Sequence, residues 1–300
     1  MSLVRPILNL WLRVTEKRYL ARETDVHALR RSFATKARLF FLAPRGTRSR
    51  PGALNGVPVL WVNDAPEGPL ILYLHGGAYV MGSPQTHRAL AGWLSRAARL
   101  PVCLPDYRLA PEHPFPAALE DALAAYRAVM DRPGGVVIGG DSAGGGLALA
   151  LLSRLLRDGL PRPLGLFALS PVTDMSFSGE SVTANAKADV VLPASRIHDM
   201  AALYLPEGVA PRDPGVSPLW ADFTGAPPVW LTAGDTEFLR DDTRRMAERL
   251  RAQGVPVMER IERDLPHVWP LFHTLLPEAR RTLRALGRWI NSLSTTTAGS

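Results

Sequence analysis

The 300-residue sequence has a single cysteine, no run of five or more like charges and no long apolar stretch. The lone thiol, Cys103, excludes an intramolecular disulfide and a metal site built from several cysteines, which favours a reducing compartment. Its apolar neighbours predict a buried strand, where a thiol is inert. No apolar run reaches the roughly 18 residues of a membrane span, and the first twelve residues lack the cleavage site of a signal peptide. We therefore expect a cytoplasmic protein.

The net charge of +7 and the pI near 10.0 are typical of proteins that bind nucleic acid. The arginines are nevertheless interleaved with Asp and Glu along two helical segments, 240–251 and 280–288. That pattern is typical of solvated helix faces, so we expect no nucleic-acid partner. The sequence also lacks H-E-x-x-H and the Lys-Ser/Thr of a phosphate loop, so we expect neither a metal nor another cofactor.

From Val57 onward, short apolar runs alternate with helical patterns, and hydrophobic residues make up 46% of the chain. This alternation predicts an α/β fold with a mostly parallel sheet covered by helices on both faces. The ligand site of such a sheet lies on loops at the carboxyl ends of its strands. We predict strands at 57–62, 70–74, 102–104, 136–138, 164–169, 229–232 and 255–261, and helices at 86–98, 116–130, 147–156, 241–253 and 278–290.

The first twenty residues have the pattern of an amphipathic helix, with an apolar stripe at Leu3, Ile7, Leu10, Trp11 and Val14. A second helical segment covers about 25–42, and 43–56 has the composition of a linker. A basic amphipathic helix can lie on a membrane surface. We favour its use as a lid packed over the rest of the protein, and we expect no membrane association.

About forty residues between two consecutive predicted strands, 176–217, are too many for a structureless loop. Their centre, 195–204, has a helical pattern, which predicts an inserted cap. The predicted organisation is N-terminal cap helices at 1–45, a catalytic core at 46–175 and 218–292, the inserted cap segment at 176–217, and a flexible tail at 293–300.

One stretch joins a predicted strand to a predicted helix through Gly140-Asp-Ser-Ala-Gly144. This fits G-x-S-x-G, the pattern of a nucleophile held on a sharp strand-to-helix turn. Glycines on both sides of Ser142 permit the tight corner. So short a pattern also arises by chance in a Gly-rich stretch. Its interpretation as a nucleophile therefore depends on finding a base, an acid and an oxyanion hole elsewhere in the chain.

A backbone-rich loop follows the strand at 70–74: His75-Gly76-Gly77-Ala78-Tyr79. Glycines let main-chain N–H groups turn inward, toward the position where a carbonyl oxygen becomes negative during acyl transfer. We predict an oxyanion hole from Gly76, Gly77, Ala78 and Ala143. His75 is expected to hold the turn rather than to act as a catalyst.

A general base is expected at His267, which follows the strand at 255–261 in the last quarter of the chain. Its position agrees with the order serine, acid, histidine that these folds use. Spacing alone leaves four carboxylates open as the acid after the strand at 229–232. They are Asp235, Glu237, Asp241 and Asp242. The other histidines, at 87, 113, 198 and 273, are expected to be structural or exposed.

Four motifs in this order resemble those of the bacterial hormone-sensitive-lipase-type carboxylesterases of the α/β-hydrolase fold. They are His75-Gly-Gly-Ala78, Asp106-Tyr-Arg-Leu-Ala-Pro-Glu112 with Phe115-Pro-Ala-Ala118, Gly140-Asp-Ser-Ala-Gly-Gly145 and Leu265-Pro-His267. The resemblance spans about 57–290, and Ala78 stands where that family has a third glycine. It implies a two-part helical cap. It also implies Glu237 as the acid, since Glu237-Phe-Leu-Arg-Asp241 fits the family's pattern, and no catalytic role for the loop 106–112.

Together these features predict a serine carboxylesterase in which Ser142, His267 and Glu237 act on short to medium acyl esters. Lactones, which are internal esters, and amides are alternative substrates. Apolar residues near the site predict an apolar pocket lined by Tyr79, Met81, Phe238 and Trp269. A non-catalytic receptor on the same fold and a membrane-surface protein are the rival classes. The expected partner is a small ester or lactone. The sequence does not decide between a monomer and a homodimer.

Overall fold

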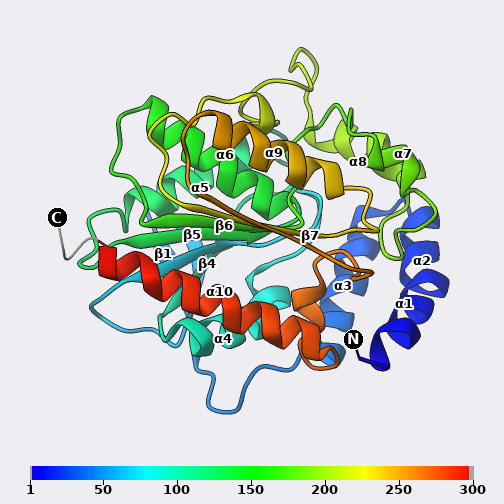
Figure 1. The fold of residues 1–300 in the computed structure, drawn as a ribbon, viewed down its shortest axis with the longest axis horizontal. Coiled ribbons are helices and arrows are strands. Elements are labelled where there is room, and N and C mark those ends of the chain that lie inside the picture. The colour runs from blue at the N-terminus through cyan, green and yellow to red at the C-terminus, as the bar shows by residue number, and fades with distance from the viewer. Residues whose placement is uncertain (1, 297–300) are drawn as a thin grey trace.

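Eight strands form one sheet at the centre of the computed structural model, which describes residues 2–296 (Figure 1). The strand order is β1-β2-β4-β3-β5-β6-β7-β8. Strand β2 runs antiparallel to β1 and β4, and all the other neighbours are parallel. The predicted mostly parallel α/β sheet is therefore confirmed. The strands are β1 (Ser49–Leu54), β2 (Val57–Val62), β3 (Leu70–Leu74), β4 (Val102–Pro105), β5 (Val136–Asp141), β6 (Gly165–Leu169), β7 (Val229–Gly234) and β8 (Val257–Glu262).

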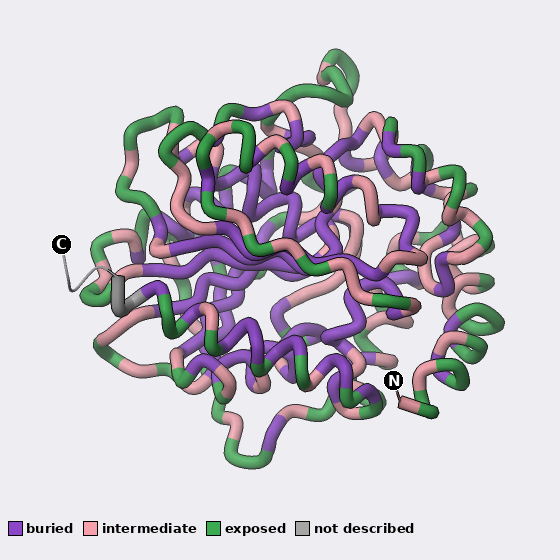
Figure 2. Tube along the Cα trace, viewed as in Figure 1, coloured by how far each residue is buried: buried purple, intermediate pink, exposed green. Residues whose placement is uncertain are grey.

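Helices cover both faces of the sheet, as Figure 1 shows. Helices α4 (Pro84–Ala98) and α10 (Pro277–Thr296) lie on one face, and α5 (Ala117–Arg127), α6 (Ala143–Arg157) and α9 (Arg240–Ala252) lie on the other. Successive residues of β3 serve the two faces in turn, as a strand's period of two requires. Leu72 packs in the cluster beneath α5 and α6, whereas Ile71 and Tyr73 pack in the cluster beneath α4 and α10. The inner strands β3 to β7 are therefore buried along their whole length, whereas the edge strands β1 and β8 are partly exposed (Figure 2).

The remaining helices gather at one end of the sheet, on the right in Figure 1. They are α1 (Val4–Val14), α2 (Glu16–Arg22) and α3 (Val26–Phe40), together with α7 (Ser181–Ala184), the 3-10 helix η1 (Ala194–Arg196) and α8 (Ile197–Tyr204) from the segment between β6 and β7. Arg30 ties α3 to the core by a bidentate ion pair with Glu112, both bonds measuring 2.7 Å. Among residues 2–296, no helix has the length and apolar composition that crossing a bilayer requires.

The segment predicted as a linker, 43–56, contains strand β1, so that part of the prediction is wrong. The missed signal is Asn55-Gly56, which joins β1 to β2 with positive φ angles of 46° and 85°. Asn-Gly is the preferred pair for a two-residue hairpin turn, because both positions need a left-handed backbone. At the other end of the chain, α10 continues to Thr296 and takes in the first residues of the predicted tail. Residues 297–300 of that tail lie outside the described part.

The apolar stripe predicted to pack inward from the first helix is largely exposed. The chain forms two helices there, α1 and α2, and α1 buries only Leu8 and Leu12. Ile7 of the stripe is 71% exposed and Leu10 is 63% exposed. Helical spacing identified the stripe correctly but could not show which face of the helix meets the protein.

Gly287 sets the approach of α10 to α4, because a Cβ at this position would lie 2.6 Å from the backbone carbonyl of Ala97. Neither the backbone of α10 nor that of α4 can move easily to make room for this Cβ. We expect Gly287→Ala to lower the free energy of unfolding by about 1–3 kcal/mol, despite the ~1 kcal/mol that alanine gains over glycine within a helix. Urea denaturation measures the change, with Asn291→Ala on the exposed side of the same helix as control. An unchanged or higher stability for Gly287→Ala would refute the close approach.

Candidate active site

Ser142 forms the corner between β5 and α6, with φ 52° and ψ −122°. Such a backbone conformation costs a non-glycine residue about 1–3 kcal/mol and persists only where the surroundings hold it. The Ser142 N–H donates to the carbonyl of Leu169 at 2.8 Å. A Cβ at Gly144 would lie 2.1 Å from the carbonyl oxygen of Leu74, so only glycine allows the helix to start this close to β3. The corner projects the serine hydroxyl beyond the end of the sheet.

The side chains of Ser142, His267 and Glu237 come from three strand-end loops and form a hydrogen-bonded series. His267 Nε2 lies 2.9 Å from Ser142 Oγ, and His267 Nδ1 lies 2.7 Å from Glu237 Oε2. The second carboxylate oxygen, Glu237 Oε1, accepts bonds from the Ser170 hydroxyl (2.8 Å) and from the N–H of Gly234 (2.5 Å). His267 and Glu237 are 7% and 1% exposed. A buried carboxylate with both oxygens engaged can orient an imidazole and stabilise its charged form.

The surroundings of His267 alter its proton affinity in opposite directions. Burial alone lowers the pKa of the imidazole, but the hydrogen bond and charge of Glu237, with the charge of Asp189 behind it, raise the pKa above its ordinary value. The ring can therefore accept a proton from the serine hydroxyl more readily than a buried imidazole without carboxylates could.

The other three carboxylates considered from the sequence are engaged elsewhere. Each accepts a bond from a backbone N–H, Asp235 from Asp264 (2.6 Å), Asp241 from Ser181 (2.8 Å) and Asp242 from Thr173 (2.7 Å). Burial raises the pKa of Asp242 to about 7. Among the described residues, Glu237 is the member of this group that contacts His267.

The loop after β3 offers fewer free donors than we predicted. The N–H of Gly76 donates to Asp141 Oδ1 at 3.0 Å, so Gly76 is not available to an oxyanion and is removed from the predicted set. Gly77 and Ala78 have positive φ angles of 128° and 55°, which turn the loop back on itself. Within residues 2–296, the N–H groups of Gly77, Ala78 and Ala143 have no acceptor. All three residues line the cavities beside Ser142.

A buried polar cluster braces this loop from below. The carboxylate of Asp141 accepts from the Tyr73 hydroxyl at 2.7 Å, and His87 Nε2 lies 3.3 Å from it. Although burial opposes ionisation, His87 and Tyr73 hold the pKa of Asp141 below its usual value. Burial lowers the pKa of His75 to about 3, and its neutral ring stacks on Tyr107 with 4.2 Å between centroids. His75 thus holds the turn, as expected, and lies outside the group around Ser142.

Two residues between β6 and β7 that sequence reasoning missed hold the loop that carries Glu237. Asn185 Nδ2 donates to the backbone carbonyls of Asp235 (2.9 Å) and Glu237 (2.8 Å). Asp189 is 1% exposed, and its Oδ2 accepts from the N–H of Phe238 at 3.1 Å. No motif marks either residue, because their role depends on a contact between segments about fifty positions apart.

The N-terminal helices reach the same segment through Lys17. Its Nζ donates to the carbonyls of Ala186 (2.8 Å) and Asp189 (2.5 Å). Burial lowers the pKa of Lys17, and the charge of Asp189 partly offsets that effect. The contact joins α2, the segment between β6 and β7, and the acid loop in one chain of hydrogen bonds.

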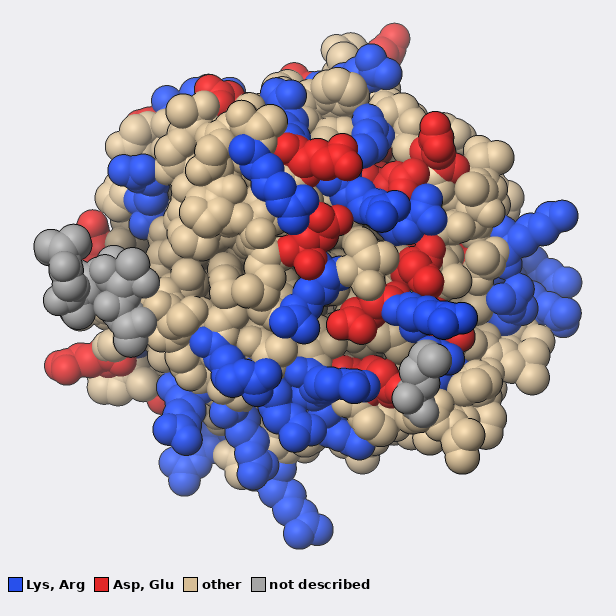
Figure 3. Space-filling model, viewed as in Figure 1, with Lys and Arg blue, Asp and Glu red and all other residues tan. Residues whose placement is uncertain are grey.

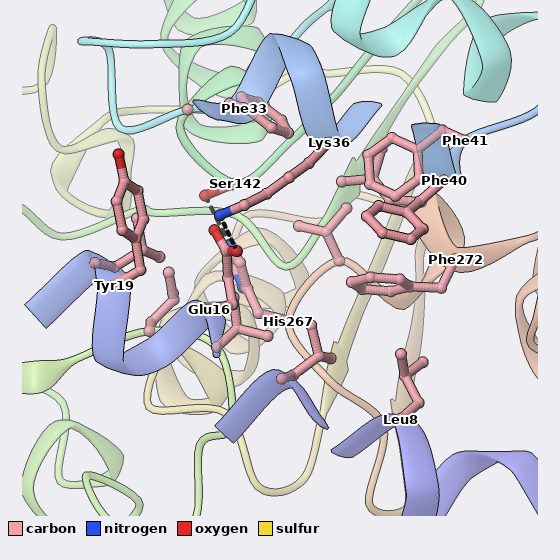
Figure 4. Close-up of a pocket in the computed structure, with 18 of the residues that line it drawn as sticks. Leu8, Glu16, Tyr19, Phe33, Lys36, Phe40, Phe41, Ser142, His267 and Phe272 are labelled. Atoms are coloured by element: carbon pink, nitrogen blue, oxygen red, sulfur yellow. Dashed lines mark hydrogen bonds and ion pairs between the residues drawn. The ribbon is translucent and has the colours of Figure 1, made fainter. Parts of the chain in front are cut away.

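Two apolar cavities meet at Ser142. The larger, of about 440 Å³, lies between α1, α2, α3 and the 3-10 helix η3 (Trp269–Phe272), and it includes His267. In Figure 4, Phe40, Phe41 and Phe272 line one side of it and Tyr19 lies opposite. The smaller, of about 100 Å³, lies beneath α8 and η1 and does not include His267. Its lining includes Met175, Phe177, Ile197, Met200 and Leu239.

Three of the four predicted pocket residues line these cavities. Met81 lines both, and Tyr79 and Phe238 line the smaller one. Trp269 is absent from both linings and is fully buried, with its indole N–H donating to Thr282 of α10 at 3.1 Å, so this part of the prediction is corrected. The preceding residue has a left-handed φ of 48°, which turns the chain into η3 and directs Trp269 into the core.

The larger cavity contains one ion pair in otherwise apolar surroundings. Lys36 Nζ lies 2.5 Å from Glu16 Oε2 and 4.4 Å from the centre of the Tyr19 ring, which connects α2 to α3 (Figure 4). Within residues 2–296, no cluster of three His, Cys, Asp or Glu side chains could hold a metal ion.

The chain is similar to known hydrolases and esterases. A family model described as the alpha/beta hydrolase fold matches residues 71–271. An acetyl-hydrolase of Streptomyces hygroscopicus is 41% identical over 236 residues, covering 77% of this chain and 79% of that protein. An esterase of Acinetobacter venetianus is 36% identical over 227 residues and covers 75% of each chain. The crystal structure of an esterase from the bacterial hormone-sensitive lipase family matches with a TM-score of 0.90 and 37% identity, over 98% of this chain and 99% of that one.

The arrangement of carboxylates around His267 generates a prediction for its titration. Asp189→Asn should lower the pKa of His267, because a negative charge that favours the imidazolium is removed. Glu237→Gln should lower it further, since Glu237 is both charged and hydrogen-bonded to the ring. NMR titration of the His267 ring measures both shifts. A His267 pKa that is unchanged or raised in Asp189→Asn would contradict the proposed coupling.

Proposed function

This chain belongs to the bacterial hormone-sensitive-lipase family of α/β hydrolases, and we propose that this carboxylic ester hydrolase works through an acyl-enzyme formed on Ser142. The observation that carries the proposal is the hydrogen-bonded series Ser142, His267 and Glu237 at the junction of two apolar cavities. A nucleophile, a base in contact with it and an acid that orients the base are the parts that covalent acyl transfer requires.

In the first half-reaction, His267 Nε2 takes the proton of Ser142 Oγ as that oxygen attacks the ester carbonyl carbon. The imidazolium is stabilised by Glu237, which stays ionised. Collapse of the tetrahedral intermediate breaks the bond to the alcohol oxygen, and His267 returns its proton to that oxygen. Water then attacks the acyl carbon while His267 takes its proton. The bond from that carbon to Ser142 Oγ breaks, His267 returns the proton to Oγ, and the carboxylic acid leaves.

The negative charge that forms on the carbonyl oxygen needs fixed donors. We assign this role to the N–H groups of Gly77, Ala78 and Ala143, which the protein leaves without acceptors among the described residues. Each such donor contributes about 10²–10³-fold in rate. Because the donors belong to the main chain, alanine at position 78 provides the same group as glycine would.

The two cavities differ in their relation to the base, and this suggests how an ester lies in the site. His267 must protonate the leaving alcohol, so the alcohol group lies on the side of His267, in the cavity of about 440 Å³. The acyl group then occupies the cavity of about 100 Å³ beneath α8. The small volume supports short to medium acyl chains, and the apolar lining of the larger cavity supports an apolar alcohol group.

Removing the nucleophile tests the mechanism. Ser142→Ala should abolish turnover of a chromogenic acetate ester, because no other group can form the acyl-enzyme. Steady-state assays measure the loss, and circular dichroism checks that the fold is kept. Retained turnover in a folded Ser142→Ala protein would exclude the proposed nucleophile.

The choice of acid is tested by a matched pair. Glu237→Gln should reduce kcat/KM by up to about 10⁴-fold, the loss that follows when the acid of a serine triad is made neutral. Asp235→Asn should retain most of the activity, since Asp235 bonds a backbone N–H and does not touch His267. The reverse ranking would assign the acid to Asp235.

The assignment of the cavities is tested by substrate preference. Met200→Ala enlarges the smaller cavity, so kcat/KM for an octanoate ester should rise relative to that for the acetate of the same alcohol. Trp11→Ala enlarges the larger cavity and is the matched control. It should leave acyl preference unchanged and alter the preference among alcohols. If Trp11→Ala shifts acyl preference and Met200→Ala does not, the two assignments are exchanged.

A further inference from the structure

Exposed apolar side chains are concentrated at the N-terminal helices. The structure exposes eleven large apolar side chains among its described residues, and ten of them lie at α1, at the end of α3 or at Leu275, three residues after η3. The most exposed are Leu3 (89%), Ile7 (71%), Leu10 (63%), Leu39 (60%) and Leu42 (56%). So many exposed apolar side chains in one region are unusual on a protein that meets only water.

This apolar surface surrounds the mouth of the larger cavity. Val4, Ile7, Trp11, Phe40 and Leu275 are exposed to solvent and also line that cavity. The rings of Trp11 and Phe40 meet edge to face, with 5.5 Å between centroids, so α1 and the end of α3 form one surface. A molecule that crosses this surface reaches Ser142 through a cavity whose lining is apolar except for the ion pair of Lys36 and Glu16 and a few other polar groups.

The same helices carry most of the protein's net charge. Residues 1–42 hold nine Lys or Arg and three Asp or Glu, which is six of the seven net positive charges of the chain. Figure 3 shows basic side chains projecting beside the N-terminal helices, at the right edge of the molecule. Arg18 of α2 and Arg38 of α3 are exposed. Arg13 of α1 is also exposed, and its guanidinium donates to the carbonyls of Lys187 and Ala188. An apolar helix face flanked by cations matches the interface of an anionic lipid layer.

We propose that this surface, formed by α1, the end of α3 and Leu275, docks on anionic lipid, contrary to the expectation from the sequence that the protein has no membrane association. Its apolar side chains enter the layer between the headgroups, and its arginines lie against the phosphates. An apolar ester dissolved in the lipid can then pass directly into the larger cavity. The docking does not depend on the proposed chemistry, but its use for substrate delivery does.

Vesicle sedimentation tests the docking. In a Ser142→Ala background, which prevents hydrolysis of lipid, the protein should bind vesicles of phosphatidylcholine mixed with phosphatidylglycerol more tightly than vesicles of phosphatidylcholine alone. Added salt should weaken the binding, because it screens charges at the surface. The combined substitutions Leu3→Ser, Leu10→Ser and Leu39→Ser should reduce the affinity at least about tenfold, since each removes an exposed apolar side chain.

The control is Met258→Ser, which changes the one large exposed apolar side chain of the described residues that lies away from this surface and should leave binding unchanged. Neither Leu3, Leu10 nor Leu39 lines the larger cavity. With Ser142 intact, the triple variant should therefore hydrolyse a water-soluble acetate ester at the wild-type rate.

Three results would overturn the docking. The first is that the protein binds neither kind of vesicle. The second is that the triple variant binds vesicles as tightly as the parent protein. The third is that the protein does not bind lipid but forms a dimer, which the triple substitution dissociates. Vesicle binding by a protein that fails to hydrolyse any ester would instead overturn the proposed function and leave the docking intact.

Discussion

The hydrogen bond of 2.7 Å between Glu237 and His267 is the interaction on which the site depends. A carboxylate that is 1% exposed is costly unless each of its oxygens has a partner. Here one oxygen meets the imidazole and the other is bonded by Ser170 and Gly234. The ring is thereby held with its second nitrogen at Ser142. If Glu237 moved, the imidazole of His267 would lose the orientation that brings it to Ser142.

The segments that enclose the site also position it. Asn185 and Asp189 bond the backbone of the loop that carries Glu237, and Lys17 connects α2 to the same segment. The N-terminal helices therefore shape the larger cavity, present an apolar and basic surface, and contact the residues behind the acid. One set of contacts both encloses the site and orients Glu237. On the proposed mechanism, a substitution in these helices can therefore alter rate and substrate choice together.

The parts that could be predicted from the sequence depend on local patterns. The alternation of strands and helices predicted the parallel sheet, and motifs at strand ends led to Ser142, His267 and Glu237. Asn55-Gly56 is also a local signal, and it indicates the hairpin that joins β1 to β2. Other features depend on tertiary contacts that no local pattern encodes: which face of α1 meets the core, the engagement of the Gly76 N–H by Asp141, the burial of Trp269 and the role of Asp189.

The proposed mechanism requires that the hydroxyl oxygen of Ser142 accepts the acyl group of the substrate, because His267 and Glu237 activate this oxygen. Intact and peptide mass spectrometry after exposure to an organophosphonate ester measures this directly, since the reagent bonds to an activated serine oxygen. The account predicts one phosphonyl group per chain, located on Ser142, and much slower labelling when Glu237 is replaced by glutamine. Labelling at a different residue, or labelling of Ser142 at the same rate without the Glu237 carboxylate, would contradict it.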